Sequence, residues 1–134
     1  MVNLDYAEPE QAVSSASKLL SKETGAKFFQ VVDRDDPRNV SCVLIKQCDE
    51  LIGFATITFG DDTCEIYRFY IAPEHRGSGL GTIAARLLDK DLQDEPFDTC
   101  FLQIDDVRTL RFWEHALGPL EVANETANMY RKDY

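Results

Sequence analysis

A strand-like stretch, a glycine-rich turn and a strongly amphipathic stretch follow one another in the middle of the chain. The turn is Arg76-Gly77-Ser78-Gly79-Leu80-Gly81, which places three glycines in six positions. From Gly79 to about Leu92, apolar residues recur at helical spacing, which predicts a helix that buries one face. A helix that joins one strand to a later one predicts parallel pairing of the two strands through a right-handed crossover. The chain is therefore expected to fold around a sheet that this helix covers.

The segments on either side extend this pattern. Three strand-like stretches precede the turn, at 40–47, 51–59 and 63–72, and their short polar connections predict an antiparallel meander. Before them we expect a helix from Pro9 to about Glu23, then a short apolar segment at 28–33 and a charged loop at 34–39. After the central helix we expect a strand at 99–104, a helix from Val107 to about Ala116 and a hairpin within 120–131. The predicted fold class is α/β, with a mixed, mostly antiparallel central sheet flanked by helices.

Length and composition limit the number of domains and the classes of partner. The chain has 134 residues, 44% hydrophobic and 28% charged, so residues 1–134 are expected to form a single domain. The net charge of −10 repels phosphate backbones and acidic lipids, so neither nucleic acid nor a membrane is an expected partner. No apolar run reaches the roughly 20 residues of a membrane span, and the first residues lack the order of a signal peptide. The expected location is the cytoplasm.

The four cysteines are Cys42, Cys48, Cys64 and Cys100, and they form no CxxC pair. Metal-binding cysteines usually occur at such short spacings or near histidines, so no metal site is expected. Free cysteine behaves as a small hydrophobic residue. We therefore expect these side chains to pack in the interior.

The glycine-rich turn suits an anionic ligand. Glycines let the backbone turn tightly and bring several N–H groups close to a ligand. The start of a helix has unpaired N–H groups and a positive dipole end, and Arg76 is expected to add a formal charge, so a pyrophosphate fits this position. A Walker loop would need a lysine where Thr82 stands, and a dinucleotide fingerprint would need its third glycine one position later. A glycine-rich turn without any ligand remains the alternative.

These residues resemble the GNAT superfamily of acyl-CoA-dependent N-acyltransferases. The family pattern Arg/Gln-x-x-Gly-x-Gly/Ala is similar to Arg76, Gly79 and Gly81 after the strand Phe69-Tyr70-Ile71-Ala72-Pro73-Glu74, and the resemblance extends from about residue 51 to 118. It implies acetyl-CoA as the co-substrate, with its pantetheine arm paired to the backbone of Phe69 and Ile71. One of those two backbone amides would polarise the thioester carbonyl. It also implies that main-chain amides hold the pyrophosphate, and these belong to Arg76, Gly77, Ser78, Gly79, Leu80, Gly81 and Thr82.

The chemistry implied by the resemblance needs a base. A lysine-like amine has a pKa of about 10.4 and is almost fully protonated at neutral pH. Glu65 is the candidate catalytic base, because it lies eleven positions before Arg76, a spacing similar to that of the catalytic glutamate in some histone-acetylating members. The alternative is a solvent-facing strand glutamate. In a regular strand Arg68 and Tyr70 would lie on the face opposite Glu65, and a bulge would change this.

The segment from Asp106 resembles the family pattern Asn-x-x-Ala-x-x-x-Tyr but departs from it. Asp106 replaces the asparagine, Thr109 the alanine, and Trp113 the tyrosine that protonates the leaving thiolate in many members. An indole N–H is not a useful acid, so water or another group such as Tyr130 would supply the proton. Phe112 is interpreted as a core residue. Solvated side chains are expected at His75, His115, Arg108 and Arg111.

The resulting prediction is an N-acetyltransferase that transfers an acetyl group from acetyl-CoA to a primary amine of a small molecule or protein, by direct nucleophilic attack. The acidic composition favours a cationic acceptor such as a polyamine, an aminoglycoside-like compound or a lysine-rich segment. The alternative is a non-catalytic acyl-CoA-binding interaction or regulatory module, which the missing tyrosine favours. The sequence identifies neither the particular acceptor nor the oligomeric state, and a homodimer stays an open alternative to a monomer.

Overall fold

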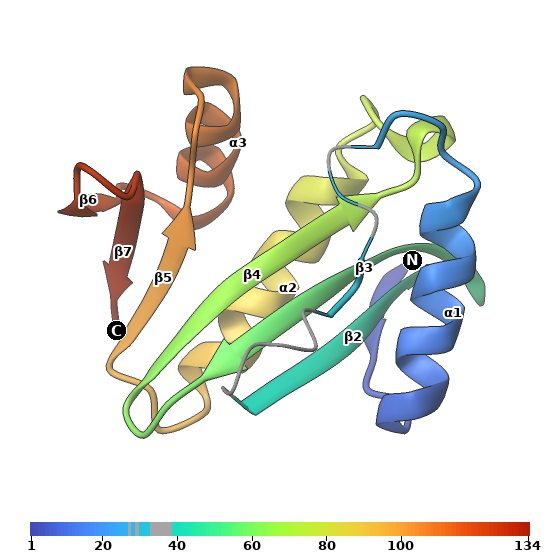
Figure 1. Cartoon of the computed structure of the whole chain (residues 1–134), viewed down its shortest axis with the longest axis horizontal. Coiled ribbons are helices and arrows are strands. Elements are labelled where there is room, and N and C mark those ends of the chain that lie inside the picture. Colours follow the sequence, from blue (N-terminus) through green and yellow to red (C-terminus); the bar gives the residue numbers. More distant parts are fainter. Residues whose placement is uncertain (27, 29, 33–38) are drawn as a thin grey trace.

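The computed structural model describes residues 1–26, 28, 30–32 and 39–134 (Figure 1). Within this part the strands form one sheet in the order β1-β2-β3-β4-β5-β7-β6. A short 3₁₀ turn at Pro73–His75 precedes α2. In chain order the elements are β1 (Val2–Asp5), α1 (Pro9–Ser21), β2 (Asn39–Gln47), β3 (Glu50–Phe59), β4 (Thr63–Ile71), α2 (Leu80–Gln93), β5 (Thr99–Gln103), α3 (Val107–Leu117), β6 (Glu121–Asn124) and β7 (Met129–Asp133).

The predicted fold class is confirmed. β4 and β5 are parallel, as the α2 crossover predicted, and the other neighbouring strands are antiparallel. The predicted helices and strands lie within about two residues of the observed ones. β1 was not expected, because its four residues are too few to show a periodicity. Most of the predicted charged loop, at 34–38, lies outside the described residues.

Helices cover both faces of the sheet (Figure 1). On one face, Ala16 of α1 packs in a buried cluster with Phe54 of β3 and Tyr70 of β4. On the other face, Leu88 of α2 and Trp113 of α3 pack in a second cluster together with sheet residues. β3 is buried along most of its length because it is covered on both sides. Among the described helices, none is long and apolar enough to cross a membrane.

β4 and β5 pair over a short distance and then separate. Residues 63–65 of β4 pair with residues 99–101 of β5, and no further pairs form between these strands in the described part of the chain. Figure 1 shows the gap widening toward the carboxyl ends of the two strands, with α3 beyond β5. β3 continues to pair with β4 as far as Ile71. The last third of β4 therefore has one paired edge and one open edge.

A β-bulge at Tyr67 changes which residues of β4 share a face. Glu65 pairs with Thr58 and Arg68 with Thr56, so three steps along β4 match two steps along β3. Tyr67 is the extra residue. Because Thr56 and Thr58 point to the same face, Glu65 and Arg68 also do. β4 is thus not a regular strand, and the bulge expected as the alternative places Arg68 on the same face as Glu65.

Three of the cysteines are buried as expected, whereas Cys48 is exposed. Cys48 lies in the tight β2–β3 turn with a φ of 50°, so its side chain leaves the sheet. The expectation that all the cysteines pack inside is wrong at this position. Among the described residues, no group of three or more His, Cys, Asp or Glu side chains could hold a metal ion.

Gly53 allows β3 and β4 to approach closely, because a Cβ at this position would lie 2.1 Å from the backbone oxygen of Tyr70. Gly53→Ala is expected to lower the free energy of unfolding by about 2 to 3 kcal/mol, since overpacking forces the backbone to shift. Gly60→Ala is the matched control, because its nearest neighbour would be 3.8 Å away. Urea unfolding measures both variants. Equal stability of the two would contradict this account of Gly53.

Candidate functional site

The glycine-rich turn leaves open space in front of α2. Gly77 and Gly79 both have a φ of 83°, a left-handed conformation that favours glycine, and a Cβ on either would meet nothing within 4 Å. Ile83 N–H donates to the carbonyl of Gly79 at 3.2 Å. The N–H groups of residues 80–82 precede this bond and have no acceptor within the helix. The start of α2 therefore presents backbone donors and a positive dipole end to an accessible space.

Arg76 is tied down by its neighbours. Its Nε donates to the carbonyl of Ile71 at 2.7 Å, and its two terminal nitrogens donate to Glu23 at 3.2 and 2.8 Å. Tyr70 Oη donates to the same carboxylate at 2.7 Å. The expectation that Arg76 adds free positive charge to the turn is wrong, because Glu23 neutralises it. The guanidinium instead fastens the turn to the end of β4 and to the segment after α1.

These hydrogen bonds also shift two pKa values. The hydrogen bonds from Arg76 first, and from Tyr70 second, hold the pKa of Glu23 below its ordinary value. Burial, together with the hydrogen bond to Glu23, raises the pKa of Tyr70 to about 12. Glu23 was missed by sequence reasoning because it lies 53 positions before Arg76 and belongs to no motif.

The open edge of β4 carries the backbone groups of Phe69 and Ile71. Ala72 N–H donates to the carbonyl of Ile52 on β3 at 2.8 Å. Backbone groups of successive strand residues point alternately to the two edges, so those of Phe69 and Ile71 point away from β3. The Ile71 carbonyl already accepts the bond from Arg76. The Ile71 N–H and both groups of Phe69 thus face the gap that opens where β5 diverges.

A cavity of about 460 Å³ joins the turn to this strand edge. Gly81 belongs to its wall, where a Cβ would come within 3.4 Å of the Phe112 ring. Ser78 and Leu80 do not line it: Ser78 donates to the carbonyl of His75, and Leu80 packs on a core cluster. The lining residues that the sequence predicted are Phe69, Ile71, Arg76, Gly77, Gly79, Gly81 and Thr82.

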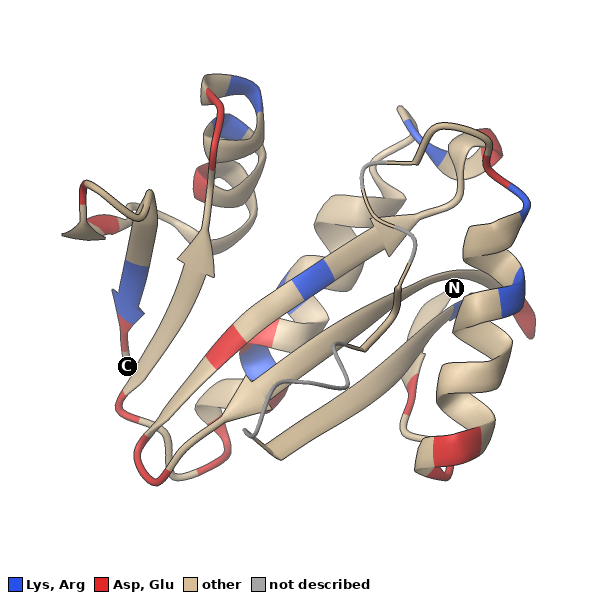
Figure 2. Cartoon of the chain, in the orientation of Figure 1, with Lys and Arg blue, Asp and Glu red and all other residues tan. Residues whose placement is uncertain are grey.

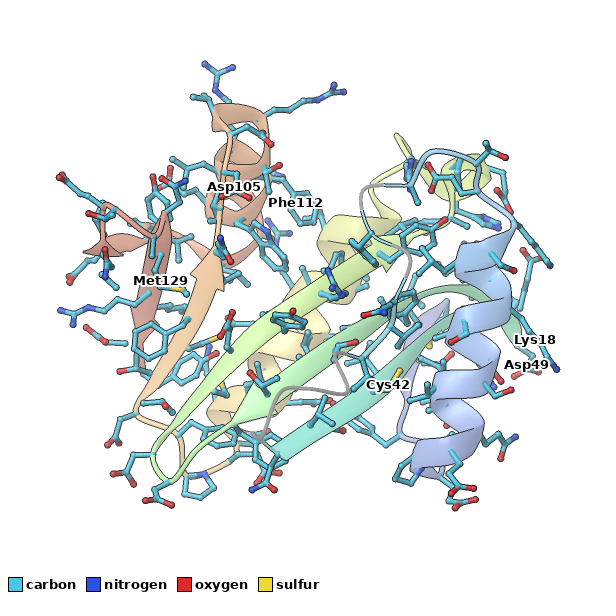
Figure 3. All side chains as sticks on the ribbon, in the orientation of Figure 1. Lys18, Cys42, Asp49, Asp105, Phe112 and Met129 are labelled. Carbon is cyan, nitrogen blue, oxygen red and sulfur yellow. The ribbon has the colours of Figure 1, made fainter. Side chains whose placement is uncertain are left out.

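A second cavity of about 610 Å³ shares the Phe69, Arg76 and Phe112 walls with the first and extends between β4 and α3. Phe112, labelled in Figure 3, therefore lines both cavities as well as packing on Phe69, and its interpretation as a core residue is incomplete. Trp113 is buried, with its ring 5.1 Å from that of Phe69. Asp106 caps α3 by accepting from the backbone of Thr109 at 2.7 Å.

Glu65 lies apart from both cavities. It lines a smaller hollow of about 150 Å³, together with Thr58 and Phe101, near the paired ends of β4 and β5. Tyr130 lies on β7 opposite Leu102 and lines neither large cavity. The two predicted proton-transfer groups are thus separated from the turn.

Charged residues near the turn are more restrained than expected. His75 forms an ion pair with Glu50 at 2.8 Å and is not a free turn residue, because its side chain is only 20% exposed.

On α3, by contrast, Arg108, Arg111 and His115 are exposed, as predicted. Figure 2 shows acidic residues in the turns at the paired end of the sheet and both basic and acidic residues around α3.

The start of α2 presents backbone donors beside the open edge of β4. This arrangement suits an extended phosphate-bearing ligand that lies along β4. The chain belongs to the acetyltransferase (GNAT) family, whose model matches residues 7–118. The resemblance seen in the sequence is therefore confirmed, as is the enzyme class, an acyl-CoA-dependent acyltransferase. No curated protein matches the sequence of this chain.

Solved structures share the whole fold at low sequence identity. A putative GNAT acetyltransferase from Desulfovibrio desulfuricans is 19% identical, with a TM-score of 0.70, over 99% of each chain. An aminoglycoside acetyltransferase, AAC(6')-Ib, solved in complex with coenzyme A, is 18% identical with a TM-score of 0.74, over 99% of this chain and 95% of the other. The ribosomal-protein-S18-alanine N-acetyltransferase from Escherichia coli is 12% identical with a TM-score of 0.66, over 98% and 90%.

The Glu23–Arg76 contact generates a pH-dependent prediction. Because the pKa of Glu23 is lower in the folded state, its stabilisation is present above the unfolded pKa of about 4.3 and is lost as the pH falls through the folded value. Glu23→Gln should therefore destabilise the protein most near neutral pH, and the difference from wild type should shrink in acid. Urea unfolding across this range measures it, with exposed Glu125→Gln as control. A Glu23→Gln deficit that does not change with pH would contradict this role.

Proposed function

We propose that this chain is an N-acetyltransferase that transfers an acetyl group from acetyl-CoA to a primary amine by direct nucleophilic attack. The observation that carries the proposal is the cavity joining the start of α2 to the open edge of β4 at Phe69 and Ile71. Family membership supports the same activity. Residues 1–134 are proposed to work as one domain, and the cytoplasm stays the predicted location.

The residues around the cavity fit the parts of coenzyme A. The diphosphate needs several donors, and the N–H groups of residues 76–82 are proposed to supply them with the dipole of α2. The pantetheine arm contains amides, which can pair with Phe69 and Ile71 as an added strand does. When bound, the thioester supplies an activated acetyl group. Two solved relatives of the fold, including one from Thermoplasma acidophilum, were crystallised with coenzyme A.

The chain's own groups would orient the reactants and move protons. A backbone N–H on the open edge of β4 can polarise the carbonyl that the amine attacks. Glu65 remains the proposed base, and because it lines a separate hollow it would act through bridging water. Trp113 cannot serve as the acid, so water is proposed to protonate the leaving thiolate.

The proposed acceptor is a primary amine of either a small molecule or a protein. One solved structure of similar fold, an aminoglycoside acetyltransferase, is in complex with coenzyme A and kanamycin, and another is named for a protein substrate. The net charge of −10 favours a cationic amine in either class. A non-catalytic acyl-CoA-binding module is the second candidate, and the presence of Trp113 at the tyrosine position favours it.

Thiol release from acetyl-CoA, measured with a panel of amines, tests the activity. Turnover with at least one primary amine is expected, whereas tight cofactor binding without turnover on any amine would favour the module.

Gly79→Ala should weaken coenzyme A binding about tenfold in calorimetry, since it strains the turn and fills the space before α2. Gly118→Ala is the matched control, because Gly118 has a φ of 92°, has equally open space and lies at the end of α3. Equal losses of affinity in both variants would contradict the assigned site.

Glu65→Gln tests the base. The turnover rate should fall by about a hundredfold at neutral pH, because an amide cannot accept the amine proton, while coenzyme A affinity stays near wild type. The exposed Glu121→Gln variant controls for lost charge. The rate of Glu65→Gln should recover at high pH, where the amine is already neutral. An unchanged rate across pH would remove Glu65 from the mechanism.

A further inference from the structure

Arg68 is a cation in the wall of the second cavity without a charged partner in the described part of the chain. Its guanidinium lies 4.5 Å from the centre of the Phe28 ring and 4.7 Å from that of Tyr67. Its Nε is buried and donates no hydrogen bond in the described structure. Two aromatic faces thus hold the guanidinium in place and leave hydrogen-bonding capacity unused.

Several other described cations of this acidic chain are paired, whereas Arg108 and Arg111 are exposed on α3. Lys46, Arg76, Arg131 and Lys132 each contact a carboxylate, and Arg86 donates to two backbone carbonyls. A buried donor without an acceptor costs free energy, and the guanidinium that carries it also lines the cavity, where a ligand can pair with its charge. The guanidinium is planar and matches a carboxylate through two parallel hydrogen bonds.

The position of Arg68 relates it to the acetyl-transfer site. The first cavity follows β4 from the turn to Phe69, and the second continues from Phe69 past Arg68. A ligand paired with Ile71 and Phe69 therefore ends beside the bulge at Tyr67. Asp105, labelled in Figure 3, and Asp106 lie on the α3 side of the same cavity. The second cavity thus presents Arg68 on β4, and across from it the carboxylates of Asp105 and Asp106 together with the exposed Arg108.

We propose that the acceptor amine carries a carboxylate, as an amino acid does, and that Arg68 selects it by binding that group. This proposal rests on the acetyltransferase function proposed above and narrows its acceptor. The carboxylate binds Arg68 on β4, and the amine, cationic before it loses its proton, lies toward Asp105 and Asp106. Arg68 is a specificity-determining residue in this arrangement, and the proton still leaves through the base.

Amines that differ by one carboxylate test the proposal. The pairs are lysine and cadaverine, ornithine and putrescine, and tyrosine and tyramine, each assayed by thiol release with acetyl-CoA. For at least one pair, wild type should favour the carboxylate-bearing member about tenfold or more in kcat/KM, as a paired guanidinium allows. Arg68→Met, which keeps an apolar stem between the two rings, should bring this ratio to about one. Arg68→Lys should restore part of it through charge alone.

The control is Arg111→Met, because Arg111 is exposed on α3 and lines neither cavity. It should keep the wild-type ratio, and thermal unfolding of each variant checks that folding is intact. Calorimetry of the same pairs with the coenzyme A-loaded protein gives a readout independent of turnover. A binding preference that depends on Arg68 but is not accompanied by turnover would support the role of Arg68 in carboxylate recognition and refute the enzyme function. Equal use and equal binding of both members, no binding of any carboxylate compound, or a preference that survives in Arg68→Met would overturn the proposal.

Discussion

The early separation of β4 from β5 is the constraint on which the site depends. Parallel pairing ends after residue 65, yet β3 continues to pair with β4 to Ile71, so one edge of β4 keeps backbone groups that no strand satisfies. α3 follows β5 away from β4, and the space between them becomes two joined cavities. A sheet that stayed paired to the end of β4 would have satisfied these groups itself and closed the cavity. The cost of leaving exposed donors and acceptors is offset when a ligand with amides lies along the strand.

The turn before α2 works with this open edge because it is held rigidly by charges that cancel. Arg76 donates to the Ile71 carbonyl and to Glu23 at once, so its side chain links the end of β4, the turn and the segment after α1. Its charge therefore serves to position the turn, and the proposed anion binding would depend on backbone N–H groups and the dipole of α2. Such donors need no counter-charge and keep their strength in a protein with a net charge of −10.

Several parts of the site follow from local patterns, and others do not. Spacing of apolar residues predicted α2, and the three glycines predicted a tight turn before it, because both depend on neighbours within a few positions. The bulge at Tyr67 was not predictable, since it is a mismatch between two strands and leaves no mark on either alone. The same bulge turns Arg68 to the face of Glu65. Contacts between distant residues, such as Glu23 with Arg76, are likewise absent from any local pattern.

The sequence by itself determined the order of the elements after β1, the mixed sheet, the tight glycine-rich turn and, through Arg76, Gly79 and Gly81, the family. These properties depend on backbone conformation and on short-range periodicity, which neighbouring residues encode. Only the tertiary structure decided that Glu23 neutralises Arg76 and that Glu65 lies apart from the two large cavities. It also decided that the Arg68 guanidinium lies against two aromatic rings in the wall of the second cavity. The physical reason is that charge pairing, burial and strand register are relations between segments brought together by folding, and the same residues in another register would have had other partners.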